Sequence, residues 1–520
     1  MIKNIKILRS KFKKYNIDGY IVPKNDDFFT EYSKINRLKI ISNFTGSAGV
    51  AIILKKKNYL FTDGRYTLQS QIESGKNFSI QDFGKLINCS LFKNFTLGID
   101  PKLFTHQQIK KFFLKNNKIK YIKKNLIDQI EKQVIINTKP FYHLNKKIVG
   151  ESTNSKLNKI SNFLKKKKTD YIFISAPENV AWILNIRGSD GPYSPIPNLR
   201  IIISKSKKIL IFSKFQKCKN LIKNKIINSK QVIDIEKFSK IISNLNGKNF
   251  AIDGKSCSIF YENIIKSKFK IKYREDPTYL LKAIKNKVEI NHMIKTHILD
   301  GIALTKFIFW IQHVNKKKIN EVDAQNKLEK FRRKNKSYLF PSFNTIAGTG
   351  SNGAIVHYRA NVKTTKSIKK NDVFLCDSGG QYKYGTTDVT RTICFRKQSN
   401  SIRDKYTKVL KGHIAVATTD LNKYDTGKKV DARARMFLKK DGLDYAHGTG
   451  HGVGFFLNVH EGPQSINKIN KVKIKPGMVL SNEPGYYKKN HFGIRIENLV
   501  YVDKIKGKLF FKNLTMAPIE

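Results

Sequence analysis

Acidic residues are scarce in this 520-residue chain. It carries 39 Asp and Glu against 100 Lys and Arg, which gives a formal net charge of +61. Such an excess is typical of nucleic-acid binders, because Lys and Arg neutralise phosphates. Here, however, the basic residues are spread along the whole chain in short runs among Ile and Asn, such as residues 165–168. We interpret them as a solvated surface that tolerates Lys, and we expect no nucleic-acid partner.

Cysteine and long apolar runs are also scarce. The five cysteines form no CxxC pair, and their odd number argues against a disulfide framework and favours a reducing compartment. No apolar run approaches the roughly 20 residues that cross a bilayer. The basic residues 1–14 lack the apolar core of a secretory signal. We therefore predict a cytoplasmic protein without a membrane partner.

The chain is too long for one ordinary core, and the usual size of about 150 residues per domain suggests roughly three domains. Residues 11–28 and 163–179 share a pattern, in which a basic amphipathic helix ends in a turn with Asp and an apolar strand follows. Strands and helices then alternate after each copy. We predict an α/β (α+β) fold with two similar mixed domains at 1–148 and 151–280, and a third domain at 281–520.

A long helix is predicted at about 279–314, near the start of the third domain. Its apolar residues recur at three- and four-residue steps. They are Ile290, Met293, Ile294, Ile298 and Ile302. Beyond residue 337, Gly-rich turns and short strands dominate, with two further helical stretches at about 401–421 and 429–440. We expect the chemistry of the protein in this part of the chain.

A first predicted hairpin carries two aspartates. A turn near 382–383 would set Asp377 directly opposite Asp388, with β-carbons about 5 Å apart. Cys376 lies beside Asp377, but alternation along a strand directs its side chain to the other face. We therefore expect Cys376 in the core and the two aspartates at a site.

A second predicted hairpin repeats the arrangement with two glutamates. A turn centred on Asn490 would set Glu483 opposite Glu497. Glu497 lies among apolar residues, where an unpaired carboxylate would be costly. Two hairpins that each present a facing pair of carboxylates are stronger evidence for a site than one hairpin alone.

Histidines gather between the two hairpins. Residues 447–462 contain His447, His451 and His460 among several glycines, which disfavour a helix and allow the backbone to approach closely. A fourth, His357, lies twenty residues before Asp377. Imidazoles in such a place can bind a metal, or donate hydrogen bonds to an oxyanion and to a leaving amine.

The carboxylates need positive charge if they converge. Four of them at one point would repel each other strongly, whereas two divalent cations would cancel their charge. The oxygen-rich donor set favours Mn²⁺-type ions, which would lower the pKa of a shared water. The sequence thus predicts a two-metal hydrolase with the ligands Asp377, Asp388, His451, Glu483 and Glu497.

These segments resemble the X-prolyl aminopeptidases (aminopeptidase P) of the pita-bread metallopeptidase family, which also holds prolidase, methionine aminopeptidase and creatinase. The matching stretches are PSFNTIAGTGSNGAIVHYRA (341–360), DSGGQYKYGTTDVTRTICF (377–395), HGTGHGVGFFLNVHEGP (447–463), LSNEPGYY (480–487) and GIRIENLVYV (493–502). Further upstream, NFTGSAG (43–49), TDGRY (62–66) and ENVAWILNIRGSD (178–190) look like the two creatinase-like N-terminal domains of its three-domain, eukaryote-like branch. The resemblance implies a pita-bread catalytic domain behind them.

The resemblance also implies a role for each ligand. Asp377 would bind one metal, usually manganese, and Asp388 and Glu497 would bridge both metals. His451 and Glu483 would complete the shell of the other metal. In many relatives of this branch the chain runs on beyond its last matching strand, and that extension contributes to a homodimer.

Further implied roles concern the reaction. Glu483 would take the proton from the attacking water, so that a metal-bridging hydroxide attacks the bond between an N-terminal residue and a following proline. His447 and His460 would stabilise the tetrahedral intermediate and orient the peptide. His357 would line the substrate site.

Three alternatives stay open at this point. The first is a prolidase, which cleaves Xaa-Pro dipeptides, or another pita-bread aminopeptidase with the same ligands. The second is a non-catalytic pita-bread binding module such as a histone-binding chaperone, although such proteins typically lose the ligands. The third is a nucleic-acid binder driven by the net charge, for which the chain shows no groove-reading motif.

Overall fold

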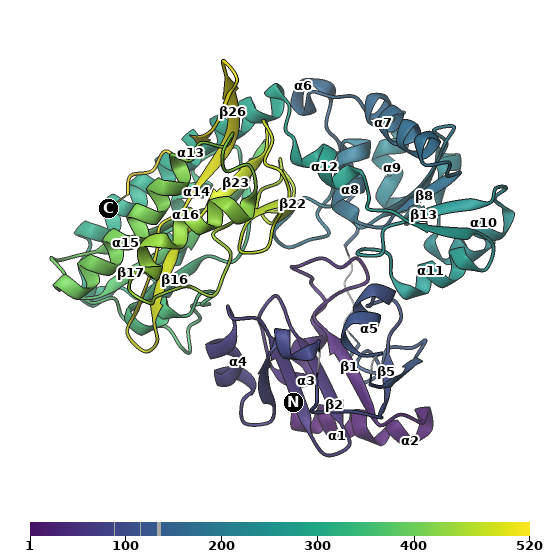
Figure 1. Ribbon diagram of the computed structural model, residues 1–520, viewed down its shortest axis with the longest axis horizontal. Coiled ribbons are helices and arrows are strands. Elements are labelled where there is room, and N and C mark those ends of the chain that lie inside the picture. Colours follow the sequence, from purple (N-terminus) through teal and green to yellow (C-terminus); the bar gives the residue numbers. More distant parts are fainter. Residues whose placement is uncertain (88, 115, 133–136, 520) are drawn as a thin grey trace. The chain divides into compact units, whose positions relative to one another are not determined.

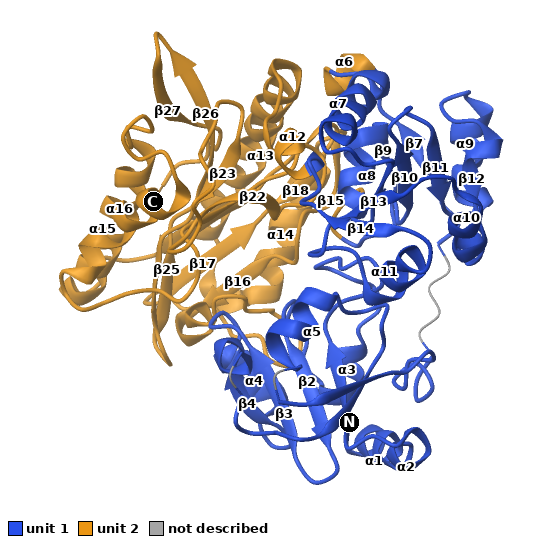
Figure 2. Ribbon diagram, turned by 45° about the vertical axis from the view of Figure 1, so that its right-hand side comes forward, with its two compact units in different colours: residues 1–145, 151–192, 196–278 blue, residues 146–150, 193–195, 279–520 orange. Residues whose placement is uncertain are grey.

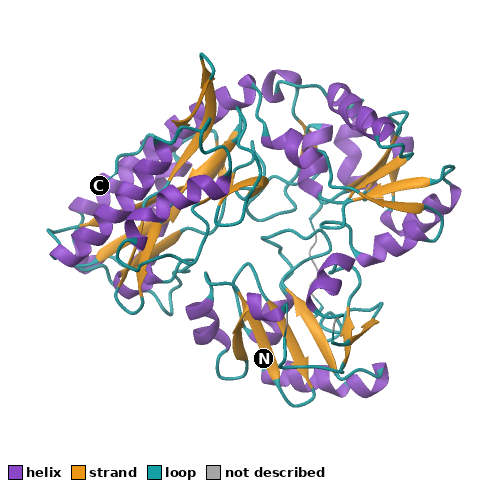
Figure 3. Cartoon of the chain, in the orientation of Figure 1, coloured by secondary structure: helices purple, strands orange, loops and turns teal. Residues whose placement is uncertain are grey.

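The computed structural model describes residues 1–519 except 88, 115 and 133–136. The chain forms two compact units (Figure 2). Unit 1 comprises residues 1–145, 151–192 and 196–278, and unit 2 comprises residues 146–150, 193–195 and 279–520. Helices and strands are mixed in both units (Figure 3). No helix among the described residues combines the length and the apolar character that a bilayer crossing requires.

Unit 1 contains two six-stranded sheets of the same topology (Figure 1). The strand orders are β4-β3-β2-β1-β5-β6 and β12-β11-β10-β8-β13-β14. Corresponding ladders run in the same sense, antiparallel for β1–β2 and β8–β10 and parallel for β1–β5 and β8–β13. The predicted internal repeat is confirmed, because residues 11–28 and 163–179 contain the equivalent strands β1 and β8.

The first sheet consists of β1 (Gly19–Pro23), β2 (Val50–Leu54), β3 (Asn58–Thr62), β4 (Ser79–Asp82), β5 (Thr96–Ile99) and β6 (Lys118–Tyr121). The second consists of β8 (Tyr171–Ile174), β10 (Arg200–Ser204), β11 (Ile209–Phe212), β12 (Val232–Ile233), β13 (Asn249–Ile252) and β14 (Lys270–Tyr273). The main helices of unit 1 are α1 (Ile2–Ser10), α2 (Phe12–Tyr15), α3 (Arg37–Ser42), α4 (Thr67–Ser74), α5 (His106–Phe112), α7 (Thr153–Lys166), α8 (Pro177–Leu184), α9 (Phe215–Lys223), α10 (Phe238–Asn244) and α11 (Ile259–Lys266).

Both faces of the first sheet are buried, as its unbroken apolar strands require. Tyr20 and Val22 of β1 pack with α1, α2 and α3 on one face, and Ile21 packs with Phe104 and Ile109 around α5 on the other. Successive strand residues thus serve opposite cores.

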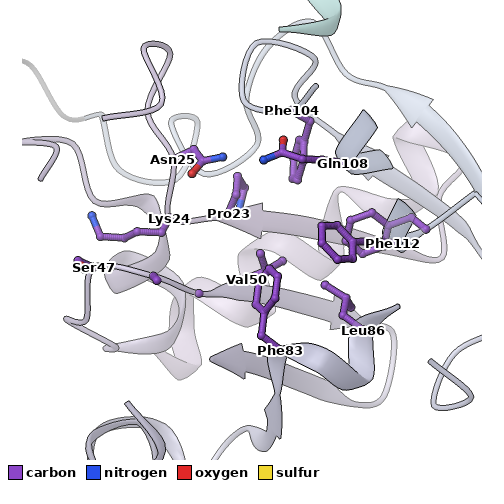
Figure 4. Close-up of a pocket in the computed structure, with 13 residues that line it drawn as sticks. Pro23, Lys24, Asn25, Ser47, Val50, Phe83, Leu86, Phe104, Gln108 and Phe112 are labelled. Atoms are coloured by element: carbon purple, nitrogen blue, oxygen red, sulfur yellow. The ribbon is translucent and has the colours of Figure 1, made fainter. Parts of the chain in front are cut away.

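A pocket of about 170 Å³ opens beside this sheet, where β1 ends and β2 begins (Figure 4). Its lining is mostly apolar, with Phe83, Phe104 and Phe112 among the contributors. None of the residues predicted to carry chemistry lines this pocket.

The predicted long helix of unit 2 is interrupted. It consists of α12 (Thr278–Ala283) and the 27-residue α13 (Lys287–His313), because Asn286 caps a new helix through its side chain. The predicted apolar stripe is partly wrong, since Ile298 and Ile302 are 46% and 50% exposed. The buried face instead includes Asp300, whose carboxylate pairs with Arg332 at 2.7 Å.

Further helices of unit 2 are α6 (Lys146–Val149), α14 (Glu321–Arg333), α15 (Asn400–Ala417) and α16 (Gly427–Lys439). The last two confirm the predicted helical stretches. One sheet, β16-β17-β20, consists of β16 (Ile346–Thr349), β17 (Val373–Ser378) and β20 (Val389–Cys394). A second, β15-β18-β19, consists of β15 (Tyr338–Pro341), β18 (Gly380–Tyr382) and β19 (Gly385–Thr386).

The largest sheet of unit 2 has the order β22-β21-β23-β26-β27. Its strands are β21 (Gly450–Gly452), β22 (Glu461–Ile466), β23 (Val479–Asn482), β26 (Asn498–Ile505) and β27 (Lys508–Asn513). A separate ribbon pairs β24 (Gly485–Lys488) with β25 (Phe492–Arg495). The five predicted metal ligands lie within the short strands of unit 2 or directly beside their ends.

Candidate metal centre

The first hairpin differs from its prediction in register. Asp377 in β17 pairs with Thr390 in β20, so Asp377 and Asp388 are not directly opposite each other. The reason is the tip, where β18 and β19 form a ladder of their own and the chain turns between Tyr382 and Gly385. The error is two residues, and because side chains alternate with period two, Asp388 stays on the face of Asp377. Cys376 is buried in the core, as predicted.

The second hairpin has the predicted register. Asn482 pairs with Asn498 in the large sheet, and Gly485 pairs with Arg495 in the separate ribbon. Both pairs are centred on Asn490, so the ladders on either side set Glu483 and Glu497 opposite each other. The two glutamates lie at the point where the chain passes from one ladder to the other.

His451 lies between the carboxylates. Its Nε2 atom is 3.4 Å from Asp388 Oδ2 and 3.4 Å from Glu483 Oε1. Its Nδ1 atom lies 2.9 Å from the carbonyl oxygen of Gly452, to which it donates, so Nε2 is left to face the carboxylates. Ligand atoms of Asp388, His451 and Glu497 all lie within 4.8 Å of one another.

Asp377 offers an independent test of whether a cation fits. Its Oδ2 atom accepts a hydrogen bond of 2.7 Å from Arg495 Nη2. Its Oδ1 atom is buried and has no hydrogen-bond partner. Buried polar atoms in folded proteins are nearly always paired, and a carboxylate oxygen left without a donor suits a cation. The residues present therefore fit a metal.

The electrostatics of the cluster point the same way. Burial, and then the neighbouring Asp388 and Glu483, raise the pKa of Asp377 to about 7 despite Arg495. Burial, Asp388 and Glu483 raise the pKa of Glu497 well above its usual range. Without cations these carboxylates cannot all be ionised at neutral pH. Divalent cations would favour the ionised carboxylates, which are the forms that bind metals.

The pKa shifts of His451 and Glu483 favour the charged form of each group, in contrast to those of Asp377 and Glu497. Burial alone would lower the pKa of His451, but Asp388 and Glu483 raise it to about 9. Burial disfavours the ionised form of Glu483, yet His451, His447 and Arg495 lower its pKa below the ordinary value. Ser481 Oγ also donates to Glu483 Oε1 at 2.9 Å. These neighbours thus favour the ionised form of Glu483.

The remaining predicted histidines lie around this cluster. His447 has its Nδ1 atom 2.7 Å from the carbonyl oxygen of Gly448 and its Nε2 atom 2.9 Å from Tyr487 Oη, and burial lowers its pKa to about 4. The ring of His460 meets the ring of His451 edge-on, with centroids 4.3 Å apart.

The His357 segment is also close to the centre. Val356, the residue before His357, accepts a hydrogen bond of 3.5 Å from Arg495 Nη1. The same guanidinium group donates to the predicted ligand Asp377, so Arg495 contacts both residue 356 and the predicted centre.

Sequence reasoning missed the residues that hold the ligands. Arg495 donates to Asp377 and to Tyr487 Oη, each at 2.7 Å, and its Nε donates to Thr390 Oγ1 at 3.0 Å. Thr390 Oγ1 in turn donates to Glu497 Oε2 at 2.6 Å. The only signal in the sequence is a lone Arg two residues before Glu497 in an otherwise apolar strand.

Comparison with known proteins is consistent with this geometry. Residues 291–504, which contain all five proposed ligands, match Metallopeptidase family M24. Residues 5–128 and 131–289 each match the Creatinase/Prolidase N-terminal domain. The predicted fold class, with two similar N-terminal domains followed by a metallopeptidase domain, is therefore confirmed.

Similar proteins extend over the whole chain. A probable Xaa-Pro aminopeptidase P of Laccaria bicolor is 37% identical over 98% of this chain and 85% of its own length. Xaa-Pro aminopeptidase 1 of Dictyostelium discoideum is 36% identical over 100% of this chain and 88% of its own.

Among solved structures, an X-prolyl aminopeptidase of Caenorhabditis elegans, described as a cytosolic enzyme with a di-nuclear active site, superposes with a TM-score of 0.91 at 28% identity. The superposition covers 100% of this chain and 91% of the Caenorhabditis elegans chain. A prolidase of Pyrococcus furiosus reaches a TM-score of 0.56 at 26% identity and covers 69% of this chain and 99% of its own. The chain belongs to metallopeptidase family M24, and within it to the Xaa-Pro aminopeptidase P proteins.

Proposed function

We propose that this protein is a dinuclear-metal aminopeptidase that hydrolyses the bond between an N-terminal residue and a following proline. The observation that carries the proposal is the grouping of Asp388, His451 and Glu497, whose ligand atoms all lie within 4.8 Å of one another. Glu483 Oε1 lies 3.4 Å from His451 Nε2, and Asp377 Oδ1 is buried without a hydrogen-bond partner. Full-length similarity to Xaa-Pro aminopeptidases supports the substrate class.

The proposed ligand roles are those that the family resemblance implies. Asp377 would hold one cation, Asp388 and Glu497 would bridge the pair, and His451 and Glu483 would hold the other. The cations would supply positive charge that lowers the pKa of a water molecule and polarises the scissile carbonyl. Mn²⁺ is the proposed ion, because the donor set is dominated by carboxylate oxygens.

The other groups act on protons and on the substrate. Glu483 stays ionised and is held by Ser481, which suits it to accept a proton from the attacking water. His447, whose ring nitrogens contact the carbonyl oxygen of Gly448 and Tyr487 Oη, would orient the peptide, as the family resemblance implies. His460, next to the His451 ring, would stabilise the tetrahedral intermediate. His357 would line the substrate site.

The decisive experiment combines metal analysis with peptide assays. With added Mn²⁺ we expect bound divalent cations and release of the N-terminal residue from Xaa-Pro-Yaa tripeptides. Cleavage of Xaa-Pro dipeptides alone would instead identify a prolidase. A metal-loaded protein without peptidase activity would identify a binding module.

A variant of His460 tests the assignment of roles. His460→Ala should lower kcat by about 100-fold, the loss typical of one stabilising donor, and should leave the metal content unchanged. Loss of the cations in this variant would contradict the assignment, because His460 would then be a ligand.

Further proposals concern the organisation of the molecule. We propose domain limits at 1–148, 151–280 and 281–520, which limited proteolysis would test. The described cysteines are all free, which supports a reducing, cytoplasmic compartment. A homodimer is the remaining expectation from the family, and light scattering would test it.

A further inference from the structure

A buried ion cluster that the proposed mechanism does not use lies next to His460. Lys282 Nζ donates to Glu461 Oε2 at 2.9 Å, and Lys285 Nζ donates to Glu461 Oε1. Each of these three side chains is at most 2% exposed. Burial of an ion costs several kcal/mol, and such a cluster contributes little net stability compared with an apolar replacement. Stability alone does not explain it.

The position of Glu461 suggests a role. Glu461 directly follows His460 and pairs with Gly452, which directly follows His451. The ladder between β21 and β22 shifts its register between His451 and Gly452. Residues 453–460, the loop that ends in His460, lie outside the strands. At the start of this loop Val453 N–H donates to the carbonyl oxygen of Val479 at 3.1 Å and Gly454 N–H donates to that of Asn458 at 2.9 Å. The carboxylate of Glu461 supplies the anchor at the end of this loop.

The two lysines come from the junction between α12 and α13, and this junction is itself fixed to the sheet. The backbone N–H of Lys285 donates to the carbonyl oxygen of Gly477 at 2.9 Å, and Ile284 forms a β-bridge with Met478. Met478 directly precedes β23, which leads to Glu483. The junction thus binds β23 through its backbone and β22 through Glu461.

We propose that Lys282 and Lys285 are positioning residues that hold His460 at the metal centre through Glu461. A carboxylate fixed by two buried ammonium groups at the first residue of β22 leaves the preceding residue little freedom. Precise placement matters, because a displacement of about 1 Å in a reacting group can cost about 100-fold in rate. The inference rests on the proposed function and on the role of His460 in it.

The test removes the whole cluster at once. Removal of one ion would leave an unpaired buried charge, whereas the triple variant Lys282→Met, Lys285→Met, Glu461→Met removes all three charges with similar volumes, a replacement that proteins tolerate. We expect the full-length variant to bind Mn²⁺ like the unaltered protein. Its kcat should fall by about 100-fold, with KM changed by less than about threefold.

A double-mutant cycle separates positioning from general damage. In a His460→Ala background, the triple variant should lower kcat by less than about twofold more, because the group that it misplaces is already absent.

Lys156→Met is the matched control. Lys156 is also a buried lysine, but it lies in unit 1, where its Nζ donates to the carbonyl oxygen of Trp182 at 2.9 Å. Any effect of this variant on kcat should be the same with and without His460.

Two outcomes would overturn the inference. Equal losses from the triple variant in both backgrounds would show that it does not act through His460. A triple variant that fails to fold or to bind Mn²⁺ would make the cluster a scaffold of the whole centre. Unaltered protein that binds Mn²⁺ but cleaves no Xaa-Pro-Yaa peptide would instead overturn the proposed function.

Discussion

The sheets of unit 1 and the strands around the metal centre in unit 2 are built on different principles. The ladders of both six-stranded sheets run without a register shift among the described residues, over wholly apolar strands such as β2 and β11. In unit 2, ladders shift register at Tyr338 and at His451, and charged groups such as Asp377 and Glu497 are buried. Apolar strands dominate the two sheets of unit 1, although isolated charges such as Lys156 are buried around them, whereas the centre gathers several carboxylates whose charges need partners.

The largest expected effect breaks the centre and leaves the sheets of unit 1 intact. Asp388→Ala removes a proposed bridging ligand, so it should abolish binding of the cations. Activity should fall by at least about 1,000-fold, because the cations supply several kcal/mol of transition-state stabilisation. Metal analysis and a tripeptide assay measure both losses. An Asp388→Ala protein that keeps its metal and its rate would refute the ligand assignment.

The converse variant should damage unit 1 and spare the centre. Phe250 of β13 is fully buried and stacks on Tyr171 with ring centroids 5.4 Å apart. Phe250→Ala should lower the free energy of unfolding of unit 1 by about 3–5 kcal/mol, measured by urea denaturation, while cation binding is unchanged. Phe215→Ala is the control, because Phe215 is 57% exposed and its loss should cost less than about 0.5 kcal/mol. Equal effects of the two variants would contradict this account.

A pH experiment tests the buried charges of unit 2. Burial, and then Arg391, lower the pKa of His413 from 6.5 to about 4. The unfolded chain therefore takes up a proton that the folded chain refuses, so stability is full above pH 6.5 and falls as the pH drops towards 4. His413→Gln should remove up to about 3 kcal/mol of this pH dependence. Parallel unfolding curves of both cation-free proteins at pH 6.5 and 4.5 measure it, and identical slopes with pH would reject the assignment.

The smallest expected effect concerns the net charge. Lys166 and Lys167 are exposed members of the basic run at the end of α7. The double variant Lys166→Gln, Lys167→Gln should change the free energy of unfolding by less than about 0.5 kcal/mol and leave kcat/KM for a neutral tripeptide unchanged. A large loss of activity would show that this run is more than a solvated surface.

The two hairpins show how far sequence reasoning can reach. The register of the second was predictable, because both of its ladders share one centre at Asn490, whose φ of +62° suits a turn. The first was wrong by two residues, because the chain turns at residues 383–384, one residue later than predicted. A shift of the turn by one residue moves every cross-strand pair by two.

In the helix α13, residues from elsewhere in the chain decide what the local sequence does not. Its existence was predictable from three- and four-residue periodicity, but Ile298 and Ile302 are exposed while Asp300 is buried. The buried side of the helix is decided by Arg332 and Tyr382, both of which donate to the carboxylate of Asp300. Such partners come from elsewhere in the chain, so an apolar stripe alone does not identify the buried face.

The sequence by itself determined the residue types of the site, the alternation of helices and strands, and the repeat in unit 1, because these depend on local periodicity and on the chemistry of single side chains. Only the tertiary structure decided that Arg495 and Thr390 donate hydrogen bonds to the predicted ligands Asp377 and Glu497, and that two lysines bind Glu461. The physical reason is that these contacts join segments about 100 residues or more apart in the chain. Their energies depend on burial, which no local pattern specifies.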